Sequence, residues 1–394
     1  MTCRRLPSRL ARLREHVLPA CLAGLLFAAH ARGDAPAPLD PARFAFPGSL
    51  ASPPTGASAG SALADRWLGT SPFENPAADV PQGITASPLL ERVNRQDVSA
   101  ANRDFSQKGG YLDFASGSLA FPWHKWSLTL YAWQPAVRLE GQSFTIGRNS
   151  GTGASGSLVT EASLRELRAG VAIGRAFGAW RAGAAGEWIR RQDSYQTQET
   201  SGSPDAGLRT VAFDGDGFGG SAGLTWERDA DARWGTRLGA ALHMTSQIAA
   251  TGAGRWTLAS GDSAFSVTPT RHGVWEGGLS ARVTVAPGTH ALASIGGRGG
   301  ETWDNFDVHT DLRTEWHAGL EWRDPEAPYA VRLGLGQENE PGAAESRAGS
   351  AGAGFSWYSG ETTIDVGIMH RAIVRAGAPN SYDDRAVASV RVRF

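Results

Sequence analysis

A strict two-residue alternation of apolar and polar side chains dominates the chain from Gly110 to Phe394. The last segment places Ala386, Ala388, Val390, Val392 and Phe394 on one face and mostly polar residues on the other. Because successive side chains of a β-strand point to opposite sides of the sheet, this period predicts strands with one apolar face. Segments of this kind, each roughly 10 to 14 residues long, are separated by Gly, Pro, Asp or Asn, which are typical of turns.

This alternation permits two architectures. A soluble β-sandwich turns its apolar face inward, whereas a membrane barrel turns it outward. The charged and Gly-rich polar face favours a barrel with a wet or plugged lumen, and Trp and Tyr at segment ends favour aromatic girdles at the membrane surfaces. The sequence therefore predicts an all-β, transmembrane antiparallel barrel of about fourteen strands. The segment at 253–259 is weak, so twelve strands remain an alternative.

The N-terminal stretch predicts three regions. Residues 1–31 combine five Arg, an apolar run and the small-residue triplet Ala29-His30-Ala31, which is typical of a secretory signal peptide. Residues 32–109 have no clean period and are rich in Pro, Ala, Ser and Gly, which predicts an N-terminal hatch inside the lumen rather than further strands. A disordered periplasmic tail is the alternative for this stretch. Residues 110–394 are expected to form the barrel in a bacterial outer membrane.

Composition excludes several classes of function. The 38 basic and 39 acidic side chains give a formal net charge of −1, which does not suit a nucleic-acid binder. The two cysteines, Cys3 and Cys21, both lie in the expected leader, so the exported part has no disulfide or thiolate metal site. No nucleophile elbow, phosphate-binding loop or zinc-protease motif is present, so the sequence predicts neither an enzyme nor a cofactor.

Charged residues on the polar faces are the candidate lumen or ligand-facing residues. They are Arg168, Arg181, Arg282, Glu315, His317, Glu321 and Arg332. We expect them to pair with one another or with the hatch, because buried charges need partners. Glu315, His317, Glu321 and Arg323 lie on one strand face and leave a metal or hydrolytic site as an alternative.

Two further groups have an ordinary and a functional interpretation. Asp214-Gly215-Asp216-Gly217 has the composition of a Ca²⁺ loop, but it lacks a third acidic position and the distal Glu, which favours a flexible start of a strand. Trp123, Trp126 and Trp133 are candidates for stacking on a ligand, although girdle or packing roles are expected for two of the three.

Several motifs, in order along the chain, resemble the outer-membrane long-chain fatty acid transporters of the FadL family. A Gly/Ala-rich run at 56–65 leads to Asn75-Pro76-Ala77, which is similar to the family's hatch motif. Residues 118–128 resemble its first hairpin, and 215–226 with 236–240 resemble its Gly-Asp-Gly-aromatic strand and the following hairpin. Residues 303–307 also have a family likeness. The chain departs from the family at 69–74 and at Asp79.

The resemblance implies a 14-stranded barrel plugged by an N-terminal hatch, a hydrophobic ligand such as a fatty acid or hydrocarbon, and a lateral gap that releases the ligand into the outer-membrane lipid. It also implies that the terminal aromatic Phe394 is the signal read by the barrel assembly machinery. Lateral release is physically reasonable, because each buried methylene is worth about 0.8 kcal/mol and a greasy ligand leaves an apolar site reluctantly for water.

The sequence thus favours a passive transporter of hydrophobic compounds. The alternatives are a general porin, and a structural barrel that docks secretion partners without moving small molecules. An outer-membrane lipid-modifying enzyme is the weakest alternative. Substrate identity, direction of flux and oligomeric state do not follow from the sequence.

Overall fold

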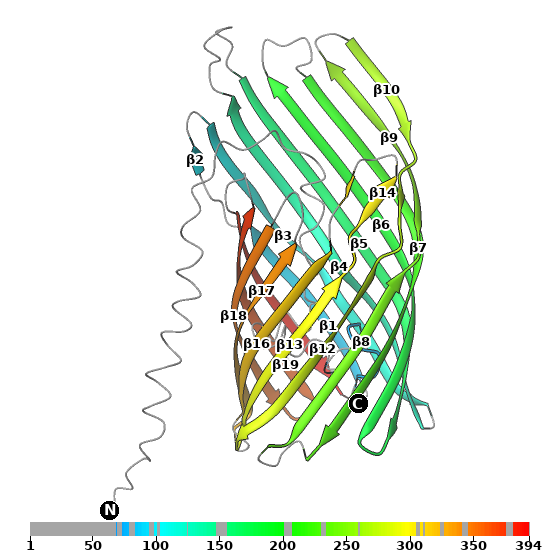
Figure 1. Ribbon diagram of the computed structural model, residues 1–394, viewed down its shortest axis with the longest axis vertical. Helices are drawn as coiled ribbons and strands as arrows, with labels where there is room; N and C mark the ends of the chain where they lie inside the picture. Colours follow the sequence, from blue (N-terminus) through cyan, green and yellow to red (C-terminus); the bar gives the residue numbers. More distant parts are fainter. Residues whose placement is uncertain are drawn as a thin grey trace, which may run out of the picture.

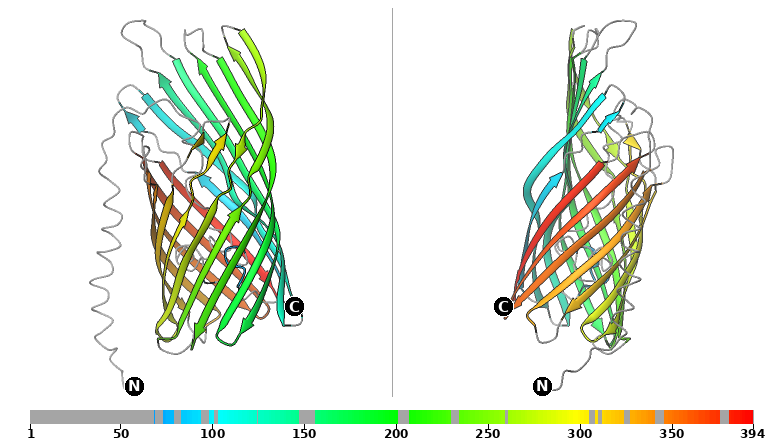
Figure 2. Two further views of the ribbon diagram at one scale, coloured as in Figure 1. Left: turned by 45° about the vertical axis from the view of Figure 1, so that its right-hand side comes forward. Right: turned by 90° about the vertical axis from the view of Figure 1, so that its left-hand side faces the viewer.

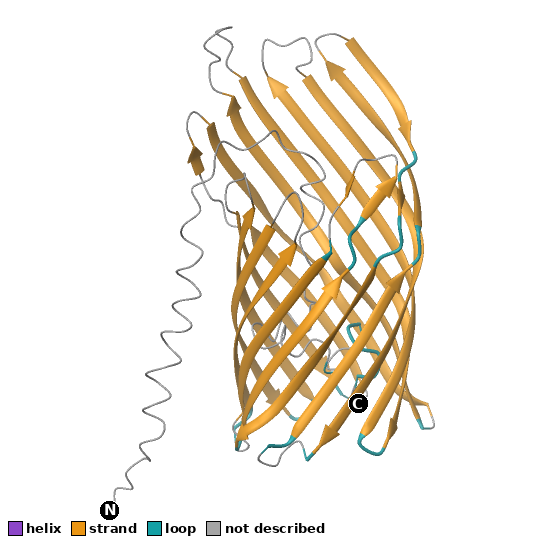
Figure 3. Ribbon diagram, in the orientation of Figure 1, coloured by secondary structure: helices purple, strands orange, loops and turns teal. Residues whose placement is uncertain are grey.

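The computed structural model consists of strands and their connections (Figures 1 and 3). The structure describes residues 68, 73–78, 83–93, 98–100, 103–123, 125–146, 156–200, 207–229, 234–258, 261–304, 308–309, 312–323, 327–340, 346–375 and 381–393. Among these residues there is no helix long and apolar enough to cross a membrane.

Twenty strands are described, and fourteen of them form the main wall. These are β1 (Gly83–Val93), β3 (Arg103–Trp123), β4 (Trp126–Ile146), β5 (Gly156–Phe177), β6 (Trp180–Thr200), β7 (Gly207–Arg228), β8 (Thr236–Thr245), β12 (Trp275–Ala286), β13 (Thr289–Arg298), β16 (Arg313–Arg323), β17 (Tyr329–Glu340), β18 (Ser346–Ser359), β19 (Thr362–Arg375) and β20 (Ser381–Val392). The six shorter or upper strands are β2 (Val98–Ala100), β9 (Ile248–Leu258), β10 (Gly261–Val267), β11 (Thr270–Arg271), β14 (Thr302–Asp304) and β15 (Val308–His309).

All pairings in the sheet are antiparallel and follow one another around a common axis (Figures 1 and 2). The order runs β1–β3–β4–β5–β6–β7–β8–β12–β13–β16–β17–β18–β19–β20, and β20 pairs again with β1. Strand β9 continues β8 upward along β7, and β11 continues β12 in the same way. We call this sheet the wall.

The structure corrects the expected start of the strands. Residues 32–109 were predicted to contribute no strand, yet β1 pairs with both β3 and β20, and β3 begins at Arg103. The alternation of apolar and polar residues is weak here, because Pro88 interrupts β1 and because Gly109 and Gly110 of β3 have no side chains. The expected segments at 233–247 and 253–259 correspond to β8 and β9, which form one line of the wall.

The two faces of the wall have opposite polarity. Large apolar side chains are exposed on the outer face, among them Leu130, Val171, Leu224, Leu279, Ile295, Leu320, Leu333, Val366 and Val390. Polar side chains are buried on the inner face, among them Ser116, Thr129, Glu166, Thr225, Ser280, Ser294, Ser356 and Ser389. This inverts the order of a water-soluble protein, in which large exposed apolar surfaces are rare.

Aromatic side chains gather where the lower hairpins turn. Trp123 is paired with Trp126 at one hairpin end, and Phe177 with Trp180 at the next. The chain reverses within two residues at this end, and Gly178 adopts a positive φ of 61° that suits glycine. These aromatic side chains lie at the ends of strands, which is where the sequence predicted an aromatic girdle.

Candidate ligand site inside the wall

The Asn75-Pro76-Ala77 motif forms a buried turn against the inner face of the wall. Asn75 Oδ1 accepts a hydrogen bond from the Ala77 backbone N–H at 2.9 Å, and the Asn75 carbonyl accepts one from the Ala78 N–H at 2.9 Å. Asn commonly bonds its own backbone two residues on, so the side chain holds the turn as the sequence predicted.

Asn75 also fastens this turn to two wall strands. Its Nδ2 donates to the carbonyl of Leu224 on β7 at 3.4 Å and to that of Ala240 on β8 at 3.2 Å. The close approach requires Gly223, because a Cβ there would overlap Asn75 Oδ1 and lie 3.0 Å from Pro76 Cδ. Asn75 is completely buried.

A second glycine and a histidine complete the contact. A Cβ at Gly183 on β6 would overlap the Pro76 carbonyl and stand 2.6 Å from the Ala77 nitrogen. Nε2 of His243 on β8 lies 2.6 Å from the Glu74 carbonyl oxygen. We call Gly183 and Gly223 the glycine seat, since together they make room for the turn.

Phe73 lies in an aromatic pocket on the same side of the interior. Its ring stacks on Trp133 with centroids 5.8 Å apart and meets Tyr131 edge-on at 5.2 Å, both residues belonging to β4. Ala172 on β5 and Ala185 on β6 complete the cluster. We call Tyr131, Trp133, Ala172 and Ala185 the ring pocket.

A buried carboxylate orients the two aromatic walls of the ring pocket. Glu187 Oε1 accepts hydrogen bonds from Tyr131 Oη at 2.8 Å and from Trp133 Nε1 at 3.3 Å. Its Oε2 accepts from Arg168 at 3.4 Å, and the Arg168 guanidinium lies 5.3 Å from the Trp133 ring centroid. Arg168 is also paired with Glu166 at 2.7 Å, so its charge is neutralised within the wall.

An ionic cluster continues upward from Arg168. Glu166 on β5 accepts from Arg191 on β6 at 3.3 Å and from Arg271 on β11 at 2.8 Å. Arg191 also pairs with Asp193 at 2.6 Å and with Glu301 at 3.7 Å. Since β7 and β9 separate β6 from β11 in the wall, these side chains tie together strands that do not pair.

A second ionic cluster holds three of the residues expected to face the lumen. Glu321 on β16 accepts from Arg282 on β12 at 2.8 Å and from Arg332 on β17 at 2.6 Å. Arg332 also donates a hydrogen bond to the Ser356 hydroxyl, which in turn donates one to Asp365 on β19. The expectation that these charges pair with one another is met by these contacts.

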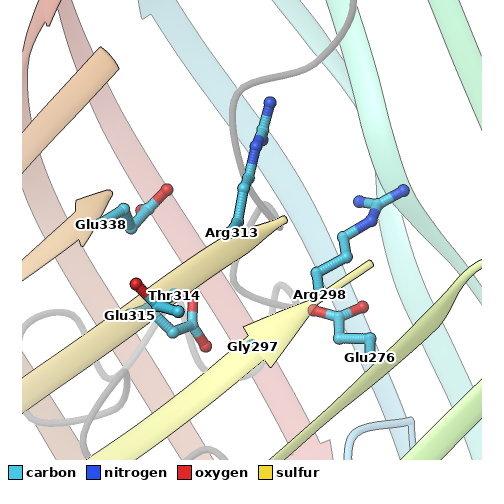
Figure 4. Close-up of a pocket in the computed structure, with 7 residues that line it drawn as sticks. All are labelled: Glu276, Gly297, Arg298, Arg313, Thr314, Glu315 and Glu338. Carbon is cyan, nitrogen blue, oxygen red and sulfur yellow. The ribbon is translucent and has the colours of Figure 1, made fainter. Parts of the chain in front are cut away.

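The remaining expected residues lie elsewhere on the inner face. His317 is buried with Nε2 at 3.8 Å from Glu315 Oε2, and its ring occupies the space where Gly336 has no side chain. Arg181 lies half-buried on β6. Glu315 also lines a polar cavity of about 10 Å³, large enough for about one water, whose other residues are Glu276, Gly297, Arg298, Arg313, Thr314 and Glu338 (Figure 4).

The structure bears on two alternatives left open by the sequence, a metal site around Glu321 and a Ca²⁺ loop at residues 214–217. Glu321 is engaged by two arginines, and among the described residues no group of three or more His, Cys, Asp or Glu side chains is arranged to hold a metal ion. The Asp214-to-Gly217 motif lies within strand β7, where Asp214 pairs with Arg190 on the outer surface at 3.0 Å. The motif is thus part of a strand, but it lies in the middle of β7 and not at its start, where the sequence placed it. Phe394 lies outside the described residues.

The ladder between β3 and β4 is interrupted beside the ring pocket. The two strands pair from Phe105 to Lys108 and again from Ser116 to Trp123, but the register skips residues 109–115 of β3 and 134–140 of β4. Trp133 is the last paired residue of β4 before this interruption.

A bulge in each strand accounts for the interruption. Ser87 and Pro88 of β1 oppose Ser116 and Phe114, so β3 has one extra residue there. Trp133 and Ala136 oppose Arg168 and Glu166 of β5, so β4 has one extra residue as well, and that bulge contains Pro135, which has no N–H to donate. Bulges bend a strand and end its pairing locally.

Part of this site was predictable from the sequence. The Asn75 motif, Arg168 and Trp133 were among the predicted residues, whereas Phe73, Tyr131, Glu187 and the glycine seat were not. Glu166, Arg191 and Arg271 also share the inner face. The signal for the first two was the spacing by two residues of the charged pairs Glu166/Arg168 and Arg191/Asp193, and no such pair marks Arg271. What this signal lacks is the partner, which comes from a different strand.

An all-strand antiparallel wall with an apolar outer face and a charged, partly filled interior is the fold class of transmembrane barrels. Comparison with solved structures narrows it to the FadL-type fold that the motifs resembled. A Pseudomonas aeruginosa FadL homologue matches with a TM-score of 0.59 and 13% identity over 88% of this chain and 99% of the other. The toluene transporters TodX of Pseudomonas putida and TbuX of Ralstonia pickettii both match with TM-scores of 0.58, at 13% and 15% identity, over 82% of this chain and 93% and 92% of theirs. No protein-family model and no curated protein matches the sequence.

Proposed function

We propose that this protein is an outer-membrane transporter that takes up hydrophobic compounds passively and releases them sideways into the membrane. The observation that carries the proposal is the ring pocket. It lies inside a wall whose outer face is apolar and whose inner face is polar, directly beside the β3–β4 interruption. The fold shared with a monoaromatic hydrocarbon channel, a toluene transporter and a FadL homologue supports the same role.

In this proposal the outer apolar face spans the bilayer and the turn at Asn75–Ala77 belongs to a hatch that closes the lumen of a 14-stranded barrel. The glycine seat supports a hatch, because glycine at positions 183 and 223 leaves room for the turn, whereas a Cβ at either position would overlap it. The ionic clusters fill the interior further, which disfavours a wide aqueous pore. The division into a leader at 1–31, a hatch and a barrel follows, with β1 assigned to the barrel rather than to the hatch.

The interruption provides the sideways exit. Unpaired backbone in a wall that faces hydrocarbon is costly unless something covers it, so a gap of this length has a function there. A ligand leaving the ring pocket through it passes from aromatic side chains into lipid without crossing water. This removes the barrier that water places before a hydrophobic molecule.

Reconstitution tests the transporter against the porin and docking alternatives. Liposomes containing the protein should accumulate a hydrophobic dye or radiolabelled hydrocarbon faster than empty liposomes, while leaking no more of a hydrophilic sugar. Conductance of nanosiemens scale in planar bilayers, with no gain in hydrocarbon uptake, would establish a porin instead. Absence of both activities would leave a docking role, to be sought by co-purification of a stoichiometric partner.

A further inference from the structure

The ring pocket is filled by a residue of the same chain. Phe73 is 1% exposed, and its ring lies against the ring of Trp133, the edge of Tyr131 and the methyl groups of Ala172 and Ala185. The pocket therefore has the shape of one aromatic ring.

The polar groups of this pocket are already satisfied away from its occupant. Tyr131 Oη and Trp133 Nε1 both donate to Glu187, and Arg168 is paired with Glu166 and Glu187. An occupant thus meets ring faces, ring edges and methyl groups. A carboxylate placed there would meet the negative charge of Glu187, so the pocket suits a neutral ring.

The side chain of phenylalanine is a benzyl group, which is toluene joined to the backbone through its methyl carbon. We propose that Phe73 is a tethered stand-in for the transported ligand, and that a free, neutral, single-ring aromatic molecule binds in the ring pocket by displacing it. This rests on the proposed transport function and names the substrate class of that site.

Displacement has a defined mechanical consequence. The chain is fixed two residues later, where Asn75 bonds Leu224 and Ala240, so exchange at the pocket moves Phe73 and leaves the turn in its seat. Trp133 borders the β3–β4 interruption, so the incoming ring arrives next to the exit. A tethered competitor acts at an effective concentration of roughly millimolar or more, which weakens the apparent affinity for the free ligand.

Ligand binding to the full-length protein in lipid nanodiscs tests the proposal. Fluorobenzene is titrated and followed by ¹⁹F NMR, with Phe73→Ala compared to wild type and to Leu68→Ala. Leu68 is a matched control, because it is also 1% exposed and contacts Leu292 rather than the ring pocket. Removing a competitor and opening an apolar cavity that can bind benzene-sized molecules should tighten binding about tenfold or more in Phe73→Ala, while Leu68→Ala should bind like wild type.

Two further arms make the outcome decisive. Fluorocyclohexane should gain much less than fluorobenzene in Phe73→Ala, because a puckered ring cannot stack on Trp133. Phe73→Leu, which keeps a large apolar side chain, should assemble even where Phe73→Ala does not and should also bind fluorobenzene more tightly than wild type, since its side chain cannot stack.

Equal binding by both Phe73 variants and by Leu68→Ala would overturn the proposal, as would an equal gain for fluorocyclohexane. The proposed function would survive these outcomes if wild-type liposomes still take up hydrocarbon. Loss of hydrocarbon uptake by the wild type would instead refute the function itself.

Discussion

Asn75 Oδ1 occupies the place that a side chain at Gly223 would need, so the turn at Asn75–Ala77 and strand β7 fit only while that position is glycine. Gly183 on β6 bears the same relation to the Pro76 carbonyl. Two residues of the wall, more than a hundred positions away in the chain, thereby decide where the N-terminal segment docks.

Gly223→Ala and Gly183→Ala should each displace the turn and open the lumen. Overpacking of this kind costs roughly 1–3 kcal/mol, enough to shift the turn out of its seat. We expect increased bilayer conductance and faster uptake of hydrophilic antibiotics. Gly186→Ala is the matched control on β6, because a Cβ there meets no atom within 4 Å. If Gly223→Ala and Gly183→Ala both show the conductance and antibiotic uptake of the wild type, a hatch does not dock at this place.

Glu166→Gln should destabilise the wall strongly, because it leaves Arg168, Arg191 and Arg271 without their shared carboxylate. Breaking a buried ion pair costs roughly 3–5 kcal/mol. Asp214→Asn removes an exposed pair with Arg190 and should cost less than about 1 kcal/mol. The temperature at which the assembled protein loses its fast migration on gels compares the two variants, and similar values would show that the cluster adds little.

Leu333→Arg should be poorly tolerated because Leu333 is 56% exposed on the apolar outer face. An arginine in the hydrocarbon costs roughly 2–4 kcal/mol near the bilayer midplane. Gln192 is exposed on the outer face of β6, opposite the exposed Asp214 of β7, so Gln192→Arg adds a cation beside a carboxylate and should be nearly neutral. Refolding equilibria in lipid vesicles measure both changes. If the two arginines cost the same, the outer face at Leu333 does not contact lipid.

Deleting Ala115 together with Pro135 should close the proposed exit. Each deletion removes the extra residue of one bulge and restores an equal count against β1 or β5. The β3–β4 ladder can then continue, and we expect an assembled, tight protein that no longer transports hydrocarbon. Uptake by liposomes is the measurement. An assembled double deletion that transports at the wild-type rate would place the exit elsewhere.

Deleting Phe394, or replacing it by Asp, should lower the amount of assembled protein in the outer membrane, if the terminal aromatic is the assembly signal that the family resemblance implies. Gel migration with and without heating measures the assembled fraction. A normal fraction in the deletion would argue against this role.

The sequence by itself determined the period of the strands and the polarity of the two faces, because both are local properties that repeat every two residues. Val390, Leu333 and Ser389 could be placed on their faces for this reason alone. It also determined the turn at Asn75, whose hydrogen bond spans two residues. Strand β1 escaped detection, since Pro88 and the glycines of β3 weaken the local period there.

Only the tertiary structure decided which side chains meet across the interior. Glu187 joins Tyr131 and Trp133 from two strands away, and Phe73 reaches them from the N-terminal segment. Such contacts depend on how the strands wind around a common axis and on small residues, such as Gly223, that allow backbones to approach. A glycine in a Gly-rich strand carries no local mark of this purpose, because the atom that needs its space belongs to a distant part of the chain.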